Sequence, residues 1–245
     1  MRILILLIGL SFSALGTAQT YQYEPVVNKA EYWVSKFAAG KDMNDLLDWS
    51  KDYLKFTEGK AAFANVNSSI MTPYYTGDVN AVDFVWLDIY PNSTDQYAAL
   101  EELVTNGAAT SAKWPGNNVR VISSWQWQIS DSPIGDDAYG MVHYQDCSLK
   151  ENVTLRDAFD AYKNFAAQAK AAGDTMGRKM IFSESGSNPS FDYVYTLWNS
   201  SISKYGADSD TYVSQLMGTA EDKVLDDIST CVNGRTYTSI PVSQP

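Results

Sequence analysis

Two acid–base groups in this sequence have surroundings that could suit catalysis, and the first is an aspartate set among aromatic rings. Asp88 shares the even-numbered positions of residues 83–90 with Phe84, Trp86 and Tyr90. In a β-strand, alternate residues lie on one face, so we expect three rings around one carboxylate. A carboxylate among rings is destabilising unless it is hydrogen-bonded or hydrated. Its pKa can then rise into the range used for proton transfer.

The second group is His143, the only histidine of the chain. It falls inside a predicted strand, and no G-x-S-x-G motif supplies the nucleophile that a Ser-His-Asp triad would need. One histidine and two cysteines are too few soft ligands for a zinc site of the usual kind. Dinucleotide and phosphate-loop fingerprints are also absent. We therefore expect no metal and no cofactor.

The elements that must position these residues occur twice in the same order. Periodicity predicts strands where apolar residues alternate and helices where they recur every three or four positions. In the first half the predicted elements are a strand at 32–38, a helix at 43–54, strands at 69–75 and 83–90, a helix at 93–107 and a strand at 119–129. In the second half they are a strand at 139–147, a helix at 155–169, strands at 178–185 and 191–198, a helix at 203–217 and a strand at 235–242. This order, βαββαβ, is the ferredoxin-like pattern.

Residue matches support a tandem repeat, with the first copy at 26–131 and the second at 139–242. The segment Asp83-Phe84-Val85-Trp86 corresponds to Asp192-Tyr193-Val194-Tyr195. Two tyrosines, Tyr193 and Tyr195, therefore take the places of the rings beside Asp88. The counterpart of Asp88 itself is Leu197, so we expect the two halves to differ chemically.

The tandem arrangement resembles the dimeric α/β-barrel superfamily, fused into a single-chain pseudo-dimer. The stretch Met71-Thr72-Pro73-Tyr74-Tyr75, followed by Asp83-Phe84-Val85-Trp86-Leu87, is similar to exported tandem-repeat proteins of marine bacteria. The resemblance implies an α+β fold in which two antiparallel sheets pack face to face. Relatives include cofactor-free monooxygenases, isomerases, chlorite dismutases and dye-decolorising peroxidases, and fold alone does not choose among them. Haem-binding relatives use an axial histidine on a helix, whereas His143 lies in a strand.

The function expected from this arrangement is binding of a small apolar or aromatic molecule between the two sheets. Val85, Leu87 and Ile89 form the aliphatic side of residues 83–90, which we expect beneath the helices. The opposite side would then line the space between the sheets. Its expected ligand-binding residues are Phe84, Trp86, Tyr90, Tyr193 and Tyr195.

Two alternatives stay open. The first is a cofactor-independent enzyme of the monooxygenase or isomerase type, with Asp88 or His143 as the catalytic base. The second is a structural or protein-interaction module in which side chains fill the space between the sheets, since aromatic residues also fill cores well. The sequence fixes neither the ligand nor the oligomeric state.

Charge and composition narrow the class of partner. The 245 residues include 18 basic and 29 acidic side chains, which gives a net charge of −11. Nucleic-acid affinity depends on neutralising phosphates, so we expect no nucleic-acid partner. With 45% hydrophobic residues, the chain has enough apolar content to fold.

The N-terminus has the pattern of a secretory signal peptide. Arg2 precedes a mostly apolar stretch at residues 3–15, and Gly16-Thr17-Ala18 offers small residues for cleavage after Ala18. No other stretch is long enough to span a membrane, so we expect a periplasmic or extracellular protein. In such a compartment Cys147 and Cys231 should form a disulfide. The βαββαβ order brings them together, because its fourth strand runs beside its first.

Cleavage after Ala18 predicts that the mature protein begins at Gln19. N-terminal sequencing or intact-mass analysis of the exported protein should show this start. Retention of residues 1–18 would contradict the prediction.

Overall fold

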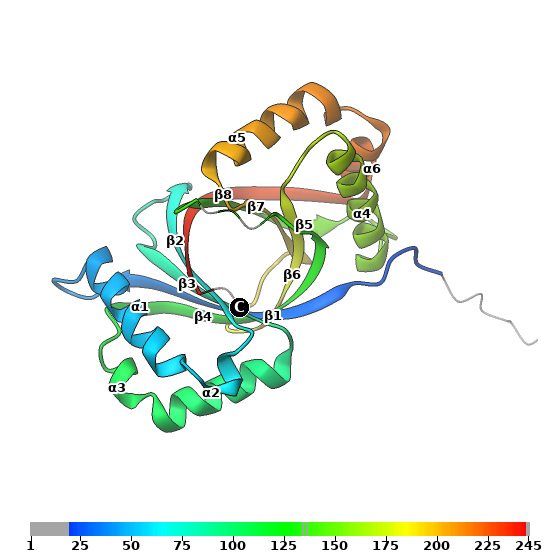
Figure 1. Cartoon of the computed structure of the whole chain (residues 1–245). Helices are drawn as coiled ribbons and strands as arrows, with labels where there is room; N and C mark the ends of the chain where they lie inside the picture. Colours follow the sequence, from blue (N-terminus) through cyan, green and yellow to red (C-terminus); the bar gives the residue numbers. More distant parts are fainter. Residues whose placement is uncertain (1–19, 134, 136, 244–245) are drawn as a thin grey trace, which may run out of the picture.

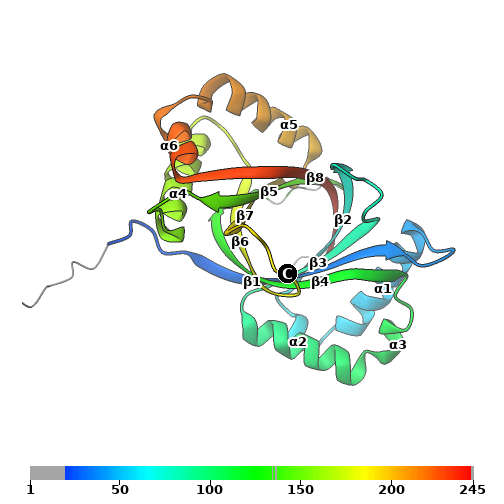
Figure 2. The same ribbon diagram turned by 180° about the vertical axis from the view of Figure 1, so that it is seen from behind.

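The computed structural model describes residues 20–133, 135 and 137–243. The proposed signal segment therefore lies outside the described residues, together with Gln19. Eight antiparallel strands close one barrel, and the helices lie outside it in two groups on opposite sides (Figure 1; Figure 2). In the part of the chain that is described, no helix is long and apolar enough to cross a membrane.

The elements follow the chain in the predicted order, with a few short elements added between them. The first half contains β1 (Val26–Phe37), α1 (Met43–Thr57), the 3-10 turn η1 (Ala61–Phe63), β2 (Asn67–Tyr75), β3 (Phe84–Tyr90), α2 (Ser93–Asn106), α3 (Ala108–Ser111) and β4 (Gly116–Ser130). The second half contains β5 (Gly140–Leu149), α4 (Leu155–Ala171), β6 (Gly177–Ser185), β7 (Tyr193–Asn199), α5 (Ile202–Thr211), the π-helical turn η2 (Tyr212–Leu216), α6 (Ala220–Ile228) and β8 (Ser229–Ser243). The added elements are η1, α3 and α6, and α6 follows a turn at Gly218 with a positive φ of 78°.

The predicted α+β barrel is confirmed, and its two antiparallel sheets are joined at their edges rather than only packed face to face. The strand order around the barrel is β1-β3-β2-β8-β5-β7-β6-β4. Two seams connect the halves: β2 pairs with β8, and β4 pairs with β6. An open sheet leaves unpaired N–H and C=O groups along its edge strands, and closure satisfies them.

Closure gives every strand an inner face toward the barrel axis and an outer face toward the helices. The inner core consists of Ala30, Met71, Val85, Leu87, Val142, Tyr144 and Ile181. Outside, α1 packs on β2 and β3 through Leu46, Trp49, Tyr53, Ile70, Phe84 and Trp86. On the other side, the core against α4 includes Ala158, Phe159, Tyr162, Met180, Tyr193 and Tyr195. The molecule therefore has three apolar layers, one inside the barrel and two beneath helices.

Matching caps fix where the main helix of each half begins. Asp42 and Thr154 accept backbone N–H bonds at the starts of α1 and α4, and each helix has a capping box completed by Asp45 or Asp157.

The predicted disulfide is confirmed. Cys147 on β5 and Cys231 on β8 are direct cross-strand partners, with Cα atoms 4.1 Å apart. The bond closes a loop with a sequence separation of 84 residues. It joins β5 to β8, the first and last strands of the second half, in the core beneath α4.

Replacing both cysteines with alanine should lower the free energy of unfolding by about 4–5 kcal/mol, because the unfolded chain regains the entropy of the open loop. Urea unfolding of the oxidised parent and the double variant measures the difference. The reduced parent is the control and should match the variant. Equal stability of oxidised parent and variant would contradict this expectation.

Candidate functional site

A chamber lined by aromatic rings lies between the barrel wall and helices α1–α3. Its volume is about 230 Å³. We call it the aromatic chamber. Its ring-bearing residues are Trp33, Trp49, Tyr53, Phe63, Trp86, Tyr90 and Trp114. Polar atoms enter its wall from Glu31, Asp88, Ser111 and Asn118.

Helix α1 supplies two of the rings from one face. Trp49 and Tyr53 stand one helical turn apart, and their rings stack with centroids 5.3 Å apart. Both meet Trp86 of β3 edge to face, at 4.9 and 5.1 Å. The indole Nε1 of Trp49 donates to the Thr110 carbonyl oxygen at 2.9 Å, which fixes that ring. The chamber therefore has stiff, well-oriented walls.

Asp88 is held in this wall by three donors. The Ser68 hydroxyl donates to Oδ1 at 2.5 Å, and the Trp86 indole donates to Oδ2 at 2.9 Å. The Tyr53 hydroxyl donates to Oδ2 at 3.4 Å. Only 4% of Asp88 is exposed, so these donors replace the water that a carboxylate normally binds.

Burial raises the pKa of Asp88 to about 7, and the hydrogen bonds from Ser68 and Trp86 lower it only in part. The charge of Glu31 raises the pKa of Asp88 further. Glu31 lies directly opposite Asp88 in the β1–β3 pair, and burial raises its pKa as well. Asp88, beside the half-buried Glu31, can thus exchange a proton with a bound molecule near neutral pH.

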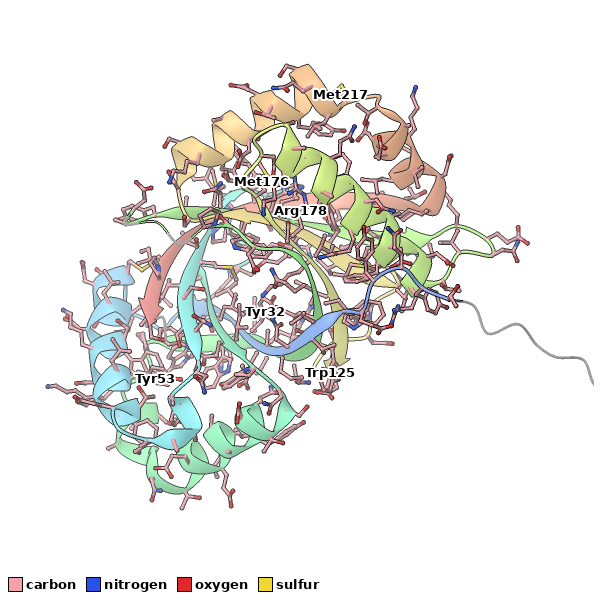
Figure 3. All side chains as sticks on the ribbon, turned by 45° about the vertical axis from the view of Figure 1, so that its right-hand side comes forward. Tyr32, Tyr53, Trp125, Met176, Arg178 and Met217 are labelled. Carbon is pink, nitrogen blue, oxygen red and sulfur yellow. A yellow bond between two sulfur atoms is a disulfide. The ribbon has the colours of Figure 1, made fainter. Side chains whose placement is uncertain are left out.

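The predicted direction of the aromatic side of β3 is wrong. Phe84, Trp86 and Tyr90 face the helices, whereas the aliphatic residues of the same strand face the barrel interior. Both sides of this strand are apolar, so alternation alone could not assign them. The aromatic side of β3 faces outward because the rings of α1 pack against it. Figure 3 separates the two faces: Tyr32 lies inside the barrel, and Tyr53 lies outside the wall under α1.

The structure does not bring Tyr193 and Tyr195 into the same site as Asp88. They pack beneath α4, where Tyr195 stacks on Tyr162 at 4.3 Å and Tyr193 shares a hydroxyl hydrogen bond with Tyr162 at 3.1 Å. The single ligand site expected from both halves is therefore divided between two helix layers.

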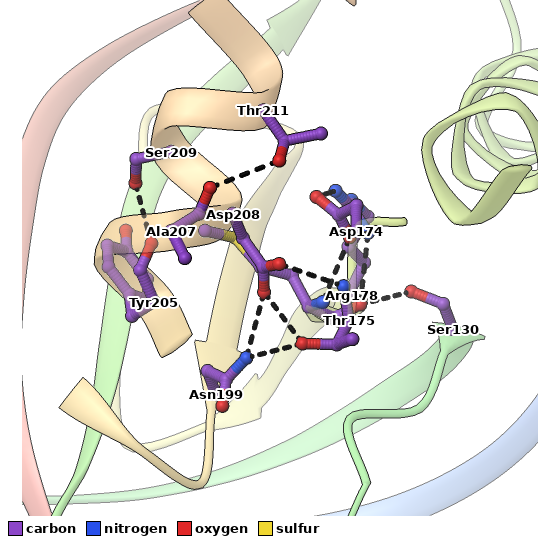
Figure 4. Close-up of polar contacts among 11 residues, drawn as sticks. Ser130, Asp174, Thr175, Arg178, Asn199, Tyr205, Ala207, Asp208, Ser209 and Thr211 are labelled. Atoms are coloured by element: carbon purple, nitrogen blue, oxygen red, sulfur yellow. Dashed lines mark hydrogen bonds and ion pairs between the residues drawn. The ribbon is translucent and has the colours of Figure 1, made fainter. Parts of the chain in front are cut away.

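In the second half, a paired ion cluster occupies the helix-covered side near the counterpart of Asp88. Arg178 is the cross-strand partner of Leu197. Its guanidinium donates to both carboxylate oxygens of Asp174 at 2.9 and 2.8 Å. Close by, Asp208 of α5 accepts from Thr175 and Asn199 (Figure 4). These charges are satisfied within the protein, so this half has no counterpart of the titrating acid.

His143 lies on the outer face of β5, away from Asp88. Its Nδ1 is 2.8 Å from the Thr236 hydroxyl, and its strand neighbours Val142 and Tyr144 point inward instead. Burial, then the charge of Arg235, lowers the pKa of His143. Because the ring does not line the aromatic chamber, the structure does not join it with Asp88 in one catalytic pair.

Sequence reasoning missed several residues of the site. Trp49 and Tyr53 carry a helical signal, since they are four positions apart in an amphipathic segment. Glu31 and Ser68 carry no local signal, because only the pairing of β1 and β2 with β3 brings them to Asp88.

Comparisons with known proteins identify the fold. No family model and no curated protein matches the sequence. A proposed monooxygenase from Fusobacterium nucleatum is similar in structure, with a TM-score of 0.57, 11% identity, and coverage of 90% of this chain and 94% of that one. A proposed monooxygenase from Lactobacillus acidophilus matches with a TM-score of 0.53, 12% identity, and coverage of 89% and 95%. A mutant chlorite dismutase from Candidatus Nitrospira defluvii matches with a TM-score of 0.52 and 8% identity, over 91% of this chain and 94% of that one.

The fold is that of the dimeric α/β-barrel proteins. Some relatives named in the resemblance bind haem through an axial ligand, and the residues of this chain can be compared with that requirement. The single histidine lies on the outer face of β5, where it is bonded to Thr236, and both cysteines are in the disulfide. These residues do not fit histidine- or thiolate-ligated haem.

The raised pKa of Asp88 has a consequence for stability. The folded protein holds this proton up to about pH 7, whereas the unfolded chain loses it near the ordinary value of 3.8. Stability from this group is therefore present at low pH and is lost as pH rises through that window. The loss should amount to about 4 kcal/mol relative to Asp88→Asn.

Urea unfolding of parent and Asp88→Asn at a series of pH values between these limits measures that difference. Asp48→Asn, at an exposed residue of α1, is the matched control and should run parallel to the parent. Parallel curves for Asp88→Asn and the parent would contradict the raised pKa.

Proposed function

We propose that the aromatic chamber binds a small, flat, apolar molecule, with Asp88 as the group that takes up its polar edge. The observation that carries this proposal is a carboxyl group that is almost fully buried, titrates near neutral pH and lies in the wall of a cavity. A buried acid weakens the fold at neutral pH. Such strain is typical of functional sites.

The chemistry follows from the parts of the chamber. Rings of Trp49, Trp86 and Trp114 offer flat apolar area that would orient a planar molecule. A hydroxyl or an activated C–H group at the edge of that molecule could then transfer its proton to the Asp88 carboxylate. Ser68 and Trp86 hold the carboxylate in place while it is charged.

A second candidate is catalysis of the cofactor-independent isomerase or monooxygenase type. Its support is the pKa of Asp88, which lies where a general base works best, and the two proposed monooxygenases that share the fold. In an isomerase, Asp88 would return the proton to another atom of the same molecule. In a monooxygenase, the carbanion left when a CH2 group loses a proton would add dioxygen and, after protonation, give a hydroperoxide. Loss of the second C–H proton would then break the O–O bond, so that the carbon keeps one oxygen as C=O and the other leaves as water.

We also propose that the chain consists of two repeats and that it is exported. We take residues 26–131 and 139–242 as two ferredoxin-like repeats, supported by matching strand orders, β4-β1-β3-β2 in the first and β8-β5-β7-β6 in the second. Only the first repeat has the acid, so it would be the active one. We take the chain as exported, supported by the signal pattern and by a disulfide of the kind that persists in oxidising compartments.

Calorimetric titration with 2-naphthol, a flat aromatic with one hydroxyl, tests the site. Above pH 7, where the Asp88 carboxylate is charged, Asp88→Asn should weaken binding about tenfold, because it removes a charged acceptor. Trp198→Ala is the matched control: it removes a ring inside the barrel and should leave binding unchanged. If the parent binds no 2-naphthol, or if Trp198→Ala weakens binding as much as Asp88→Asn does, the chamber is not the site.

A filled core makes a different prediction for Trp86. Replacing Trp86 with alanine should destabilise a packed core by about 3–5 kcal/mol. Under the proposal this variant also loses 2-naphthol while it is still folded, as circular dichroism would show. Loss of stability with no ligand bound by any variant would support the structural alternative.

A further inference from the structure

The barrel interior contains a second built site, on the opposite side of β3 from the aromatic chamber. A layer of Tyr32, Met71, Tyr144 and Ile181 crosses the interior and lines the cavities on both sides of it. One cavity, of about 700 Å³, contains the Asp146–Arg235 ion pair. The other, of about 450 Å³, contains Lys179. We call the latter the lysine cavity.

Lys179 is a buried cation with an incomplete set of partners. Only 7% of it is exposed, and its Nζ donates to Gln126 Oε1 at 2.9 Å. An ammonium group has three donors, and this is the one hydrogen bond that Nζ makes to described residues. No described carboxylate lies within ion-pair distance of it.

The two other buried cations of the described chain are both paired. Lys29 contacts Glu184, and Arg178 contacts Asp174. Taking a charge out of water without a counter-ion is strongly destabilising. Lys179 therefore differs from them in a way that points to a counter-ion from outside the described protein.

The surroundings of Lys179 are arranged to hold that group at one place. The ring of Trp198 lies with its centroid 5.2 Å from Nζ. A Cβ at Gly177 would fall 2.1 Å from that ring, so glycine is required for it to lie there. Gln126 is itself oriented by donating to the Tyr32 hydroxyl at 2.8 Å. Ring, amide and ammonium thus form one positioned group.

The rest of the cavity lining combines a group of aliphatic side chains with a group of polar ones. Its apolar lining includes Met71, Leu87, Ile89, Val142 and Ile181. Its polar lining includes the hydroxyl groups of Ser132, Ser200, Ser239 and Ser243 and the carboxylate of Asp137. A ligand with one charged end and an apolar body matches this division.

We propose that the lysine cavity binds a small monocarboxylate with an apolar tail, its carboxylate paired with Lys179 and its tail packed on the aliphatic side chains of the lining. The proposal is independent of the function assigned to the aromatic chamber. Burial also lowers the pKa of Lys179 to about 8, and the charge of Asp131 raises it. Asp131 already accepts a hydrogen bond from Gln128. A bound carboxylate would favour the charged form of Lys179.

Calorimetry with octanoate and with octan-1-ol tests this site, since the two probes share a tail and differ in charge. The parent should bind octanoate about tenfold more tightly than octan-1-ol, as expected for one buried charge pair. Lys179→Met keeps the length of the side chain and removes the charge. It should remove this preference and leave the binding of octan-1-ol unchanged.

Two controls locate the effect. Lys51→Met, at an exposed residue of α1, should behave like the parent, and so should Asp88→Asn in the aromatic chamber. A melting-temperature rise with octanoate in the parent, absent in Lys179→Met, shows the same pairing in a folded variant. Equal binding of both probes by the parent, or an unchanged octanoate preference in Lys179→Met, would overturn the proposal. Loss of octanoate binding in Asp88→Asn would also overturn it, by placing the ligand in the other site.

Discussion

Closure of the barrel is the constraint on which the rest of the structure depends. The two seams, β2 with β8 and β4 with β6, remove the open edges that two four-stranded sheets would otherwise expose. Closure also gives each strand residue one of only two destinations, the interior or a helix layer. Neighbouring residues therefore serve separate sites: on β3, Leu87 lines the lysine cavity while Asp88 enters the aromatic chamber.

The two helix layers differ in how they handle charge. Beneath α4 and α5, Arg178 and Asp174 neutralise each other, and Asp208 is hydrogen-bonded to Thr175 and Asn199. Beneath α1, Asp88 and Glu31 face each other with no cation bonded to either among the described residues. Under α4 and α5, the charge of Arg178 is balanced by Asp174. Under α1, Asp88 can gain or lose a proton near neutral pH. Similar scaffolds thus place a structural ion pair in one half and a titrating acid in the other.

The sequence predicted what depends on local periodicity, and it failed where strands from distant parts of the chain decide. The alternation along β3 and the helical spacing in α4 were enough to place those elements, and the repeat order was enough to pair Cys147 with Cys231. The side of the sheet on which Trp86 lies could not be predicted, because both faces of its strand are apolar. Only the packing of α1 against the aromatic face determines it. Lys179 was missed because a lone lysine in a strand usually lies on a solvated surface, and burial of both strand faces follows only from closure.

The central claim is that a carboxyl group in the aromatic chamber exchanges its proton near neutral pH. Infrared difference spectroscopy during a pH titration measures this most directly, because a buried protonated carboxyl has its own C=O stretching band. The account predicts a band that disappears with a midpoint near pH 7 in the parent and is missing in Asp88→Asn. A parent without such a band at pH 6, or a band that persists unchanged in Asp88→Asn, would contradict it.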